Sequence, residues 1–163
     1  MMRKNNYLIL SGGTGGHVIP AVNFGNFIIE KGYKCYLLID ERGEKYTGSF
    51  KGQIRIINSS HFSYNFFGKI RAVIFHIIGF FQSLKYILII RPRSCIAFGG
   101  YATFTPLLVL VFFRIFGLTK IFLHEQNSVM GKVNIAFTPF ANKIFLNFEK
   151  TIKIKNNFKK KSF

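Results

Sequence analysis

The chain has 163 residues, 49% of them hydrophobic, and its 23 Lys and Arg residues against six Asp and Glu residues give a net charge of +17. This length and apolar content predict one globular domain with a sizeable core and exclude a disordered chain. Residues 51–124 hold nine basic and no acidic residues. Such a charge favours phosphate-rich partners, either a nucleic acid or an anionic membrane. A Lys-, Asn-, Ile- and Phe-rich composition shared by a whole proteome would give the same excess.

Short apolar runs alternate with longer helical patterns along the chain. Predicted strands cover residues 7–10, 34–39, 53–57, 94–98, 120–124 and 143–148, and predicted helices cover 18–31, 67–90, 106–116 and 129–140. Strands that are apolar throughout indicate a sheet buried on both faces. The sequence therefore predicts an α/β fold with a Rossmann-like, doubly wound parallel sheet. Ligands of such sheets bind beyond the carboxyl ends of the strands, where the loops 12–17, 99–105 and 125–130 are expected to converge.

The first of these loops is rich in glycine. Residues 11–17 read S-G-G-T-G-G-H between the first predicted strand and helix. Glycines let backbone N–H groups approach a ligand, and the helix N-terminus behind them suits a diphosphate, although strand-to-helix turns also use glycine for geometry alone. His17 adds a titratable group. The loop lacks the Lys-Ser/Thr of a P-loop and has Val18 where a dinucleotide fingerprint needs glycine, so only Asp40, after the second strand, leaves a nicotinamide alternative open.

The second loop follows the fourth predicted strand with Gly99, Gly100 and Tyr101. The glycine pair again permits a ligand to lie close to the backbone. Tyr101 is suited to donate a hydrogen bond to a phosphate or to stack on a sugar, and the alternative is an ordinary aromatic residue at the rim.

The third loop follows the fifth predicted strand with four polar side chains, at residues 124–127. Such a run is difficult to bury without partners. Glu125 is either an ion-pair partner or a group that orients a hydroxyl or His17. Gln126 and Asn127 both donate and accept, which suits sugar hydroxyls. The alternative for Asn127 is a cap on the next helix.

Other features give fewer indications. Cys35 and Cys95 lie in strand-like runs and are expected to be buried thiols, with no metal site. The apolar run near the N-terminus is too short for a signal peptide. The apolar segments 72–84 and 104–116 do not reach the ~18 residues of a membrane span. We therefore expect a cytoplasmic protein that associates with a membrane.

Three separated motifs carry a resemblance to a known family. They are G-G-T-G-G-H-V-I-P-A at 12–21, F-G-G-Y at 98–101, and H-E-Q-N at 124–127 with Gly131 and Asn134 behind it, and F-A-x-K at 140–143 adds support. Over essentially its whole length the chain resembles the N-terminal domain of the bacterial undecaprenyldiphospho-muramoylpentapeptide N-acetylglucosaminyltransferases. These belong to glycosyltransferase family 28 and have the GT-B fold.

The resemblance implies transfer of N-acetylglucosamine from UDP-N-acetylglucosamine to lipid I, which gives lipid II in peptidoglycan synthesis, without a metal ion or other cofactor. It implies that His17 and Glu125 are catalytic, with His17 either a base or a contact to the diphosphate. The substrate-binding residues that it implies are Gly13, Thr14, Gly15, Gly16, Gly100, Tyr101, Gln126 and Asn127.

The resemblance also implies peripheral docking on the cytoplasmic face of the inner membrane through an apolar patch ringed by basic residues. A matching stripe at helical spacing consists of Phe67, Ile70, Ile74, Ile77, Ile78, Phe81, Leu84 and Leu88. The alternative is that this stripe packs on the sheet. No nucleic acid is expected as a partner, because the chain shows no recognition helix or RNA-binding motif.

The chain departs from the family in length, because family members carry a second α/β domain with most of the donor contacts. We expect residues 1–150 to form the acceptor-binding and membrane-docking domain and 151–163 to form a basic tail or a truncated linker. Half of a two-domain cleft cannot enclose the donor, so the chain is expected to be inactive alone. It is then a disrupted coding sequence, the membrane-recruiting subunit of a split transferase with a separate C-terminal donor-binding chain, or a non-catalytic acceptor-binding module. The alternative from another class is a non-catalytic basic module that binds lipid or nucleic acid.

Overall fold

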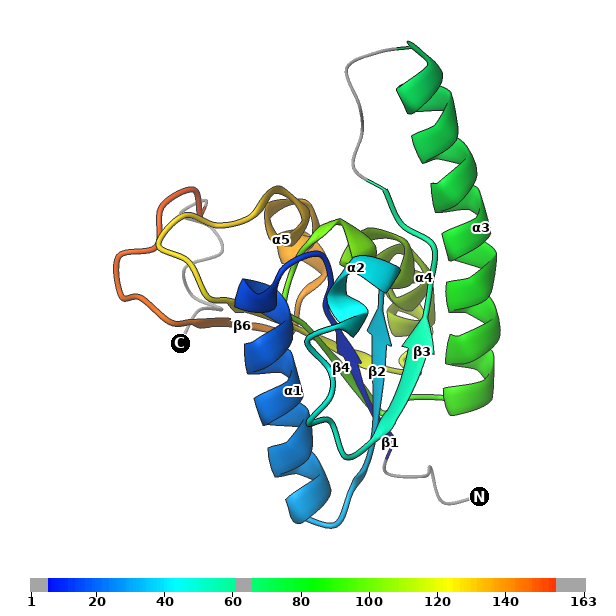
Figure 1. Cartoon of the computed structure of the whole chain (residues 1–163). Coiled ribbons are helices and arrows are strands. Elements are labelled where there is room, and N and C mark those ends of the chain that lie inside the picture. Colours follow the sequence, from blue (N-terminus) through cyan, green and yellow to red (C-terminus); the bar gives the residue numbers. More distant parts are fainter. Residues whose placement is uncertain (1–5, 61–65, 155–163) are drawn as a thin grey trace.

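The computed structural model describes residues 6–60 and 66–154, which form one six-stranded sheet with helices on both faces (Figure 1). The strands are β1 (Asn6–Leu10), β2 (Lys34–Ile39), β3 (Gln53–Ile56), β4 (Ser94–Ala97), β5 (Lys120–Glu125) and β6 (Lys143–Leu146). All neighbouring pairs are parallel, in the order β3-β2-β1-β4-β5-β6. The predicted doubly wound parallel sheet is therefore confirmed.

The helices divide between the two faces of the sheet. Their bounds are α1 (Gly15–Glu30), α2 (Glu41–Glu44), α3 (Phe66–Ile90), α4 (Phe104–Ile115) and α5 (Lys132–Phe137), with short 3-10 turns η1 (Tyr101–Thr103) and η2 (Thr138–Phe140). Successive residues of a strand point to opposite faces. Leu8 and Leu10 accordingly belong to the core under α3, α4 and α5, whereas Ile9 packs with α1. Figure 1 shows α1 and α3 on opposite sides of the sheet.

The strand order places the candidate loops. The chain leaves β1 toward β2 on one side, and after β3 it crosses back to β4 on the other side of β1. The order of strands thus reverses between β1 and β4, which is where open α/β sheets form their ligand crevice. The loops after β1 and β4 flank this point, and the loop after β5 lies next to them.

The helix boundaries differ most from the sequence prediction at α1 and α5, and those of α3 and α4 agree within two residues. Helix α1 begins at Gly15, three residues earlier than predicted, so two of the loop glycines form its first turn. The predicted helix 129–140 is shorter, because residues 129–131 form a loop and η2 replaces its last turn around Pro139. Pro139 has no N–H group to donate to a carbonyl of the preceding turn, so the α-helical hydrogen bonds cannot continue through it. Helix α2 and η1 were not predicted.

Helix α3 matches the predicted helix 67–90 to within one residue, and it extends well beyond the apolar segment 72–84 that was too short for a membrane span. It has 25 residues, and in the part of the chain that the structure describes it is the one helix long and apolar enough, by length and composition, to cross a membrane. Its buried stripe is narrow, and three of its six residues are small: Ala72, His76, Gly79, Ser83, Ile87 and Ile90. Its N-terminal turns extend past the carboxyl edge of the sheet (Figure 1).

Near its described end the chain returns to the loop that precedes α5. Ile152 N–H donates to Ser128 O at 2.7 Å, and Met130 N–H donates to Ile152 O at 3.0 Å. The predicted domain boundary at residue 150 stays a prediction, and residues 155–163 of the predicted tail lie outside the described part. The buried thiols are confirmed, and burial raises the pKa of Cys35 to about 12.

Candidate active site

The loops after β1 and β4 meet backbone to backbone. Gly100 has φ +89°, and a Cβ added to it would lie 2.6 Å from the carbonyl oxygen of Gly12. Gly99 has φ +88°, and a Cβ there would lie 3.6 Å from the His17 ring. Both glycines are thus needed for conformation, and Gly100 also for close approach. The predicted convergence of these two loops is confirmed.

The loop after β5 joins them through side chains. His17 Nδ1 lies 2.8 Å from Gln126 Oε1, although 109 residues separate the two in sequence. Gln126 Nε2 in turn lies 3.0 Å from Nδ1 of His124, whose ring stacks on Phe98 at 4.8 Å between centroids. Burial lowers the pKa of His124, and the charge of Glu125 opposes this in part. All three predicted loops therefore lie at one edge of the sheet.

Glu125 is buried at the end of β5, and its carboxylate holds the loop that follows. Oε1 accepts hydrogen bonds from the backbone N–H and the side-chain amide of Asn127, at 3.1 and 3.0 Å. Oε2 accepts from Gly131 N–H and from the Asn134 amide, both at 2.9 Å. The partner of the His17 ring is Gln126 rather than Glu125. Since Gly131 is the N-cap of α5, the cap alternative for Asn127 is wrong.

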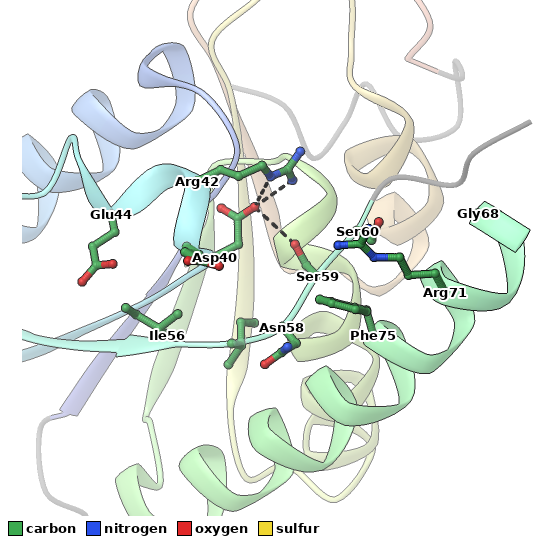
Figure 2. A pocket seen from close by; sticks show the side chains of 12 residues that line it. Asp40, Arg42, Glu44, Ile56, Asn58, Ser59, Ser60, Gly68, Arg71 and Phe75 are labelled. Carbon is green, nitrogen blue, oxygen red and sulfur yellow. Dashed lines mark hydrogen bonds and ion pairs between the residues drawn. The ribbon is translucent and has the colours of Figure 1, made fainter.

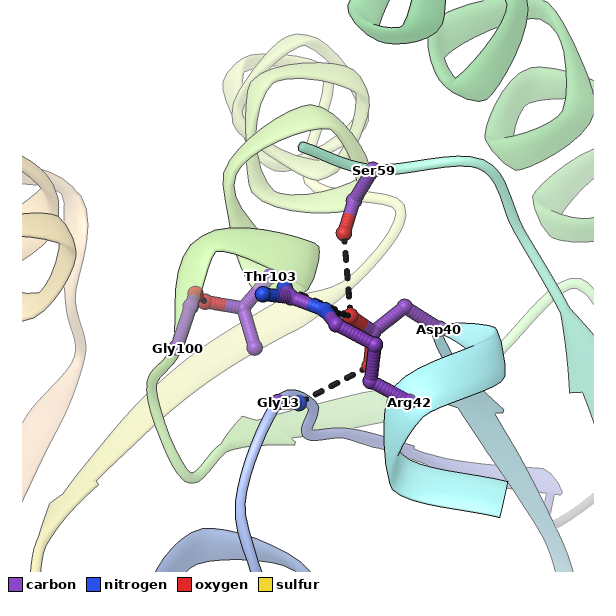
Figure 3. Close-up of polar contacts among 6 residues, drawn as sticks. All are labelled: Gly13, Asp40, Arg42, Ser59, Gly100 and Thr103. Atoms are coloured by element: carbon purple, nitrogen blue, oxygen red, sulfur yellow. Dashed lines mark hydrogen bonds and ion pairs between the residues drawn. The ribbon is translucent and has the colours of Figure 1, made fainter. Parts of the chain in front are cut away.

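The Asp40 side chain is hydrogen-bonded to the glycine-rich loop at Gly13 (Figure 3). Its Oδ1 accepts a hydrogen bond from Gly13 N–H at 2.8 Å. Its Oδ2 accepts from Arg42 Nε at 2.8 Å, lies 2.7 Å from Arg42 Nη2, and accepts from Ser59 Oγ at 3.3 Å. Both carboxylate oxygens are engaged by the protein, which argues against the ribose-binding alternative. One signal in the sequence could have indicated this bracing role, an acidic residue directly after the second strand.

Helix α1 presents its N-terminus at the same edge. Thr14 is its N-cap, and the residue's side chain makes no capping hydrogen bond. The amides of Gly15 and Gly16 lie in the first turn, where N–H groups have no partner within the helix. Thr14 and Gly16 are exposed, as are Tyr101 and Asn127 from the other two loops. The edge can thus offer backbone donors, a phenol and an amide to a phosphorylated or hydroxyl-rich ligand.

A cleft of about 760 Å³ opens beside this edge, between α2, residues 56–60 and α3 (Figure 2). Asp40 and Arg42 line one side of it, and Arg71 and Phe75 of α3 line the other. The sequence analysis did not identify this cleft, because its walls come from a short charged helix and from a segment without a motif. Among the described residues no group of three or more His, Cys, Asp or Glu side chains is placed to hold a metal ion.

A six-stranded parallel sheet whose carboxyl edge carries a glycine-rich turn and two polar loops defines one half of a GT-B glycosyltransferase. The chain belongs to glycosyltransferase family 28, because the model of the N-terminal domain of that family matches residues 7–146.

Curated relatives from Rickettsia are named UDP-N-acetylglucosamine–N-acetylmuramyl-(pentapeptide) pyrophosphoryl-undecaprenol N-acetylglucosamine transferase. The relative from Rickettsia prowazekii is 38% identical over 143 residues, which cover 87% of this chain and 35% of the relative. The relative from Rickettsia felis is 35% identical over 142 residues, which cover 87% of this chain and 38% of that relative. The chain thus spans little more than a third of the length of these relatives.

Solved structures show the same fold. The MurG of Acinetobacter baumannii superposes with a TM-score of 0.77 at 22% identity, over 93% of this chain and 44% of that one. The glycosyltransferase SsfS6 of Streptomyces sp. SF2575 superposes with a TM-score of 0.58 at 11% identity, over 86% of this chain and 49% of that one.

Proposed function

We propose that this chain is the acceptor-side half of an enzyme that transfers N-acetylglucosamine from UDP-N-acetylglucosamine to lipid I, which gives lipid II in peptidoglycan synthesis. The meeting of three loops at one edge of the sheet carries the proposal, with His17 bonded to Gln126 and Gly100 against Gly12. The names of the curated relatives support the donor and the lipid-linked acceptor.

The proposed chemistry is a direct displacement at the anomeric carbon of the donor. A base takes the proton of the acceptor hydroxyl, the oxygen forms the new glycosidic bond, and UDP leaves with the electron pair of the broken bond. We propose His17 as the base and the first-turn amides of α1 as the groups that stabilise the departing diphosphate. Glu125 acts in this proposal as a positioning residue, because its four hydrogen bonds hold Asn127 and the start of α5.

Transfer of labelled N-acetylglucosamine to lipid I in detergent tests this function. The chain is assayed alone and again with the C-terminal domain of a Rickettsia relative supplied as a separate protein. Since a single domain cannot enclose the donor, we expect transfer only with the added domain. A His17→Gln variant, assayed with the same domain, should lose at least about 100-fold in rate if His17 is the base.

The two other outcomes are equally informative. Transfer by the chain alone would contradict the assignment of the donor site to a second domain. Absence of transfer in both arms would overturn the transferase proposal and leave a disrupted coding sequence or the acceptor-binding module. Lipid I binding by the chain without transfer would then identify the module.

We also propose that the chain docks on the cytoplasmic face of the inner membrane through α3 and α4. Seven of the eight predicted stripe residues are 42% to 83% exposed, whereas Leu84 packs against the core. The alternative that the stripe packs on the sheet is therefore wrong for all but one of its residues. Helix α4 adds Leu108, Phe112 and Ile115, and α3 packs against α4. Because the buried stripe of α3 ties it to the domain, we propose docking on the surface rather than spanning.

A further inference from the structure

A continuous chain of side-chain hydrogen bonds connects two histidines of the site through Gln126. One end of the Gln126 amide lies 2.8 Å from His17 Nδ1, and the other lies 3.0 Å from His124 Nδ1. A glutamine amide presents an acceptor at one end and two donors at the other. Its orientation therefore decides which nitrogen carries the proton in both rings.

The backbone carbonyl of His124 fixes that orientation. Gln126 Nε2 lies 3.4 Å from His124 O, which can only accept a hydrogen bond. With its NH₂ group toward His124, the amide donates one hydrogen to this carbonyl and the other to His124 Nδ1. The reverse orientation would bring two oxygens together without a hydrogen between them. The hydrogen-bond network thus assigns Oε1 to the side of His17.

The two rings then have different protonation. His124 accepts at Nδ1 and is neutral with its proton on Nε2, in agreement with the lowering of its pKa by burial. His17 faces an oxygen that can only accept, so its Nδ1 carries a proton and donates. In the neutral ring the lone pair is then on Nε2, and within the described part of the chain Nε2 makes no hydrogen bond.

We propose that Gln126 is a positioning residue that holds neutral His17 in the Nδ1–H tautomer and so makes Nε2 an obligate acceptor. In this form Nε2 can take a proton from a hydroxyl group, but it has no hydrogen to donate to a phosphate oxygen. The geometry thereby separates the two roles implied for His17 and assigns it to the acceptor hydroxyl rather than to the diphosphate. Gln126 itself acts on the ring rather than on the substrate.

The proton transfer balances at His17 alone. The O–H bond of the hydroxyl breaks and an N–H bond forms at Nε2. Nδ1 keeps its own proton, which stays hydrogen-bonded to Gln126 Oε1. The hydrogen bond to Oε1 then comes from a charged imidazolium and is stronger than before. This catalytic consequence rests on the proposed function, whereas the tautomer of His17 is a property of the chain by itself.

The tautomer is measured directly by long-range ¹H–¹⁵N correlation NMR on the full chain with labelled histidine. Spectra are recorded at about pH 8.5, where an ordinary imidazole is neutral, and His17→Gln and His124→Gln variants assign the rings. We expect a protonated Nδ1 and an unprotonated Nε2 for His17, and the opposite pattern for His124. In Gln126→Leu the ratio of Nδ1–H to Nε2–H forms of His17 should fall about tenfold, because one hydrogen bond selects the tautomer.

Two further variants separate this role from a structural one. Gln126→Glu keeps an oxygen facing His17 and should retain the Nδ1–H form. Gln82→Leu removes a glutamine that bonds Asn58, away from His17, and should leave the tautomer unchanged. An Nε2–H tautomer in the unmodified chain, or an unchanged ratio in folded Gln126→Leu, would overturn the proposal. Neither result depends on activity, so a failed transfer assay leaves this test intact.

Discussion

Asp40 is a single residue on which two parts of the site depend. Its buried carboxylate bonds the N–H of Gly13, pairs with Arg42 and accepts from Ser59. Asp40→Ala removes all of these bonds and takes the acceptor away from the half-buried Gly13 N–H and Ser59 hydroxyl. We expect the free energy of unfolding to fall by about 3 kcal/mol, measured by urea denaturation.

A surface pair of similar geometry provides the control. Glu30 bonds Lys51 at 3.0 Å, but both side chains are about 60% exposed. Solvent screens such a pair, and Glu30→Ala should lower the free energy of unfolding by less than about 1 kcal/mol. Equal losses in the two variants would show that Asp40 does not brace the loop.

Buried histidines make stability depend on pH. Burial lowers the pKa of His76 and of His124 below the ordinary 6.5 in the folded chain. Below pH 6.5 the unfolded chain therefore binds protons that the folded chain does not, so stability is retained above this pH and decreases as pH falls. For each histidine the free energy of unfolding changes by at most about 1.4 kcal/mol per pH unit. Urea denaturation between about pH 7.5 and pH 5 should show this loss, and a smaller slope in His124→Gln. An unchanged slope in His124→Gln would contradict the expectation that His124 contributes to this pH dependence.

At the scale of elements, the β4–η1 turn depends on a glycine for two separate reasons. Gly100 has a positive φ, and an added Cβ would strike the carbonyl of Gly12. Gly32 also has a positive φ, +84°, but an added Cβ there has nothing within 4 Å. Gly32→Ala should therefore lower the free energy of unfolding only by the cost of a positive φ for alanine, about 1–2 kcal/mol. In urea denaturation, Gly100→Ala should lower the free energy of unfolding by at least twice as much, because the loops after β1 and β4 must also separate. Equal losses would mean that the contact with Gly12 contributes nothing.

The elements were largely predictable from the sequence, and their side-chain contacts were not. Buried parallel strands read as short apolar runs, so β2 was predicted to the residue and the others within two residues. Helix α2 was not predicted, because its four residues, E-R-G-E, show no apolar periodicity. The convergence of the three loops followed from topology alone. The bonds Gly13–Asp40 and His17–Gln126 join residues 27 and 109 positions apart and depend on side-chain rotamers, which no local pattern encodes.

At the scale of the whole molecule, the two ends of the sheet differ in character. The apolar faces of α3 and α4 are exposed, and the basic side chains of Lys69, Arg71 and Lys85 lie on the same long helix. Lys31, Lys34 and Lys120 are also exposed, but they lie where α1 ends and where β2 and β5 begin, at the amino edge of the sheet. The first group shares its helix with most of the exposed apolar residues proposed to dock, whereas only single exposed residues such as Phe27 and Leu118 lie beside the second group.

This difference gives a charge-matched test of membrane docking. Each basic residue near an anionic surface contributes about 1 kcal/mol, so reversing Lys69, Arg71 and Lys85 to Glu should weaken binding to phosphatidylglycerol vesicles by at least about 100-fold. Reversing Lys31, Lys34 and Lys120 to Glu changes the net charge equally and should weaken binding much less, because none of these residues lies on α3, which carries most of the exposed apolar residues proposed to dock. Equal losses in the two triple variants would show that the net charge of +17 alone attracts the membrane. Unchanged binding after the α3 reversal would show that α3 does not dock. Sedimentation with vesicles at two salt concentrations measures all of these outcomes, since the electrostatic part weakens with salt and the apolar part does not.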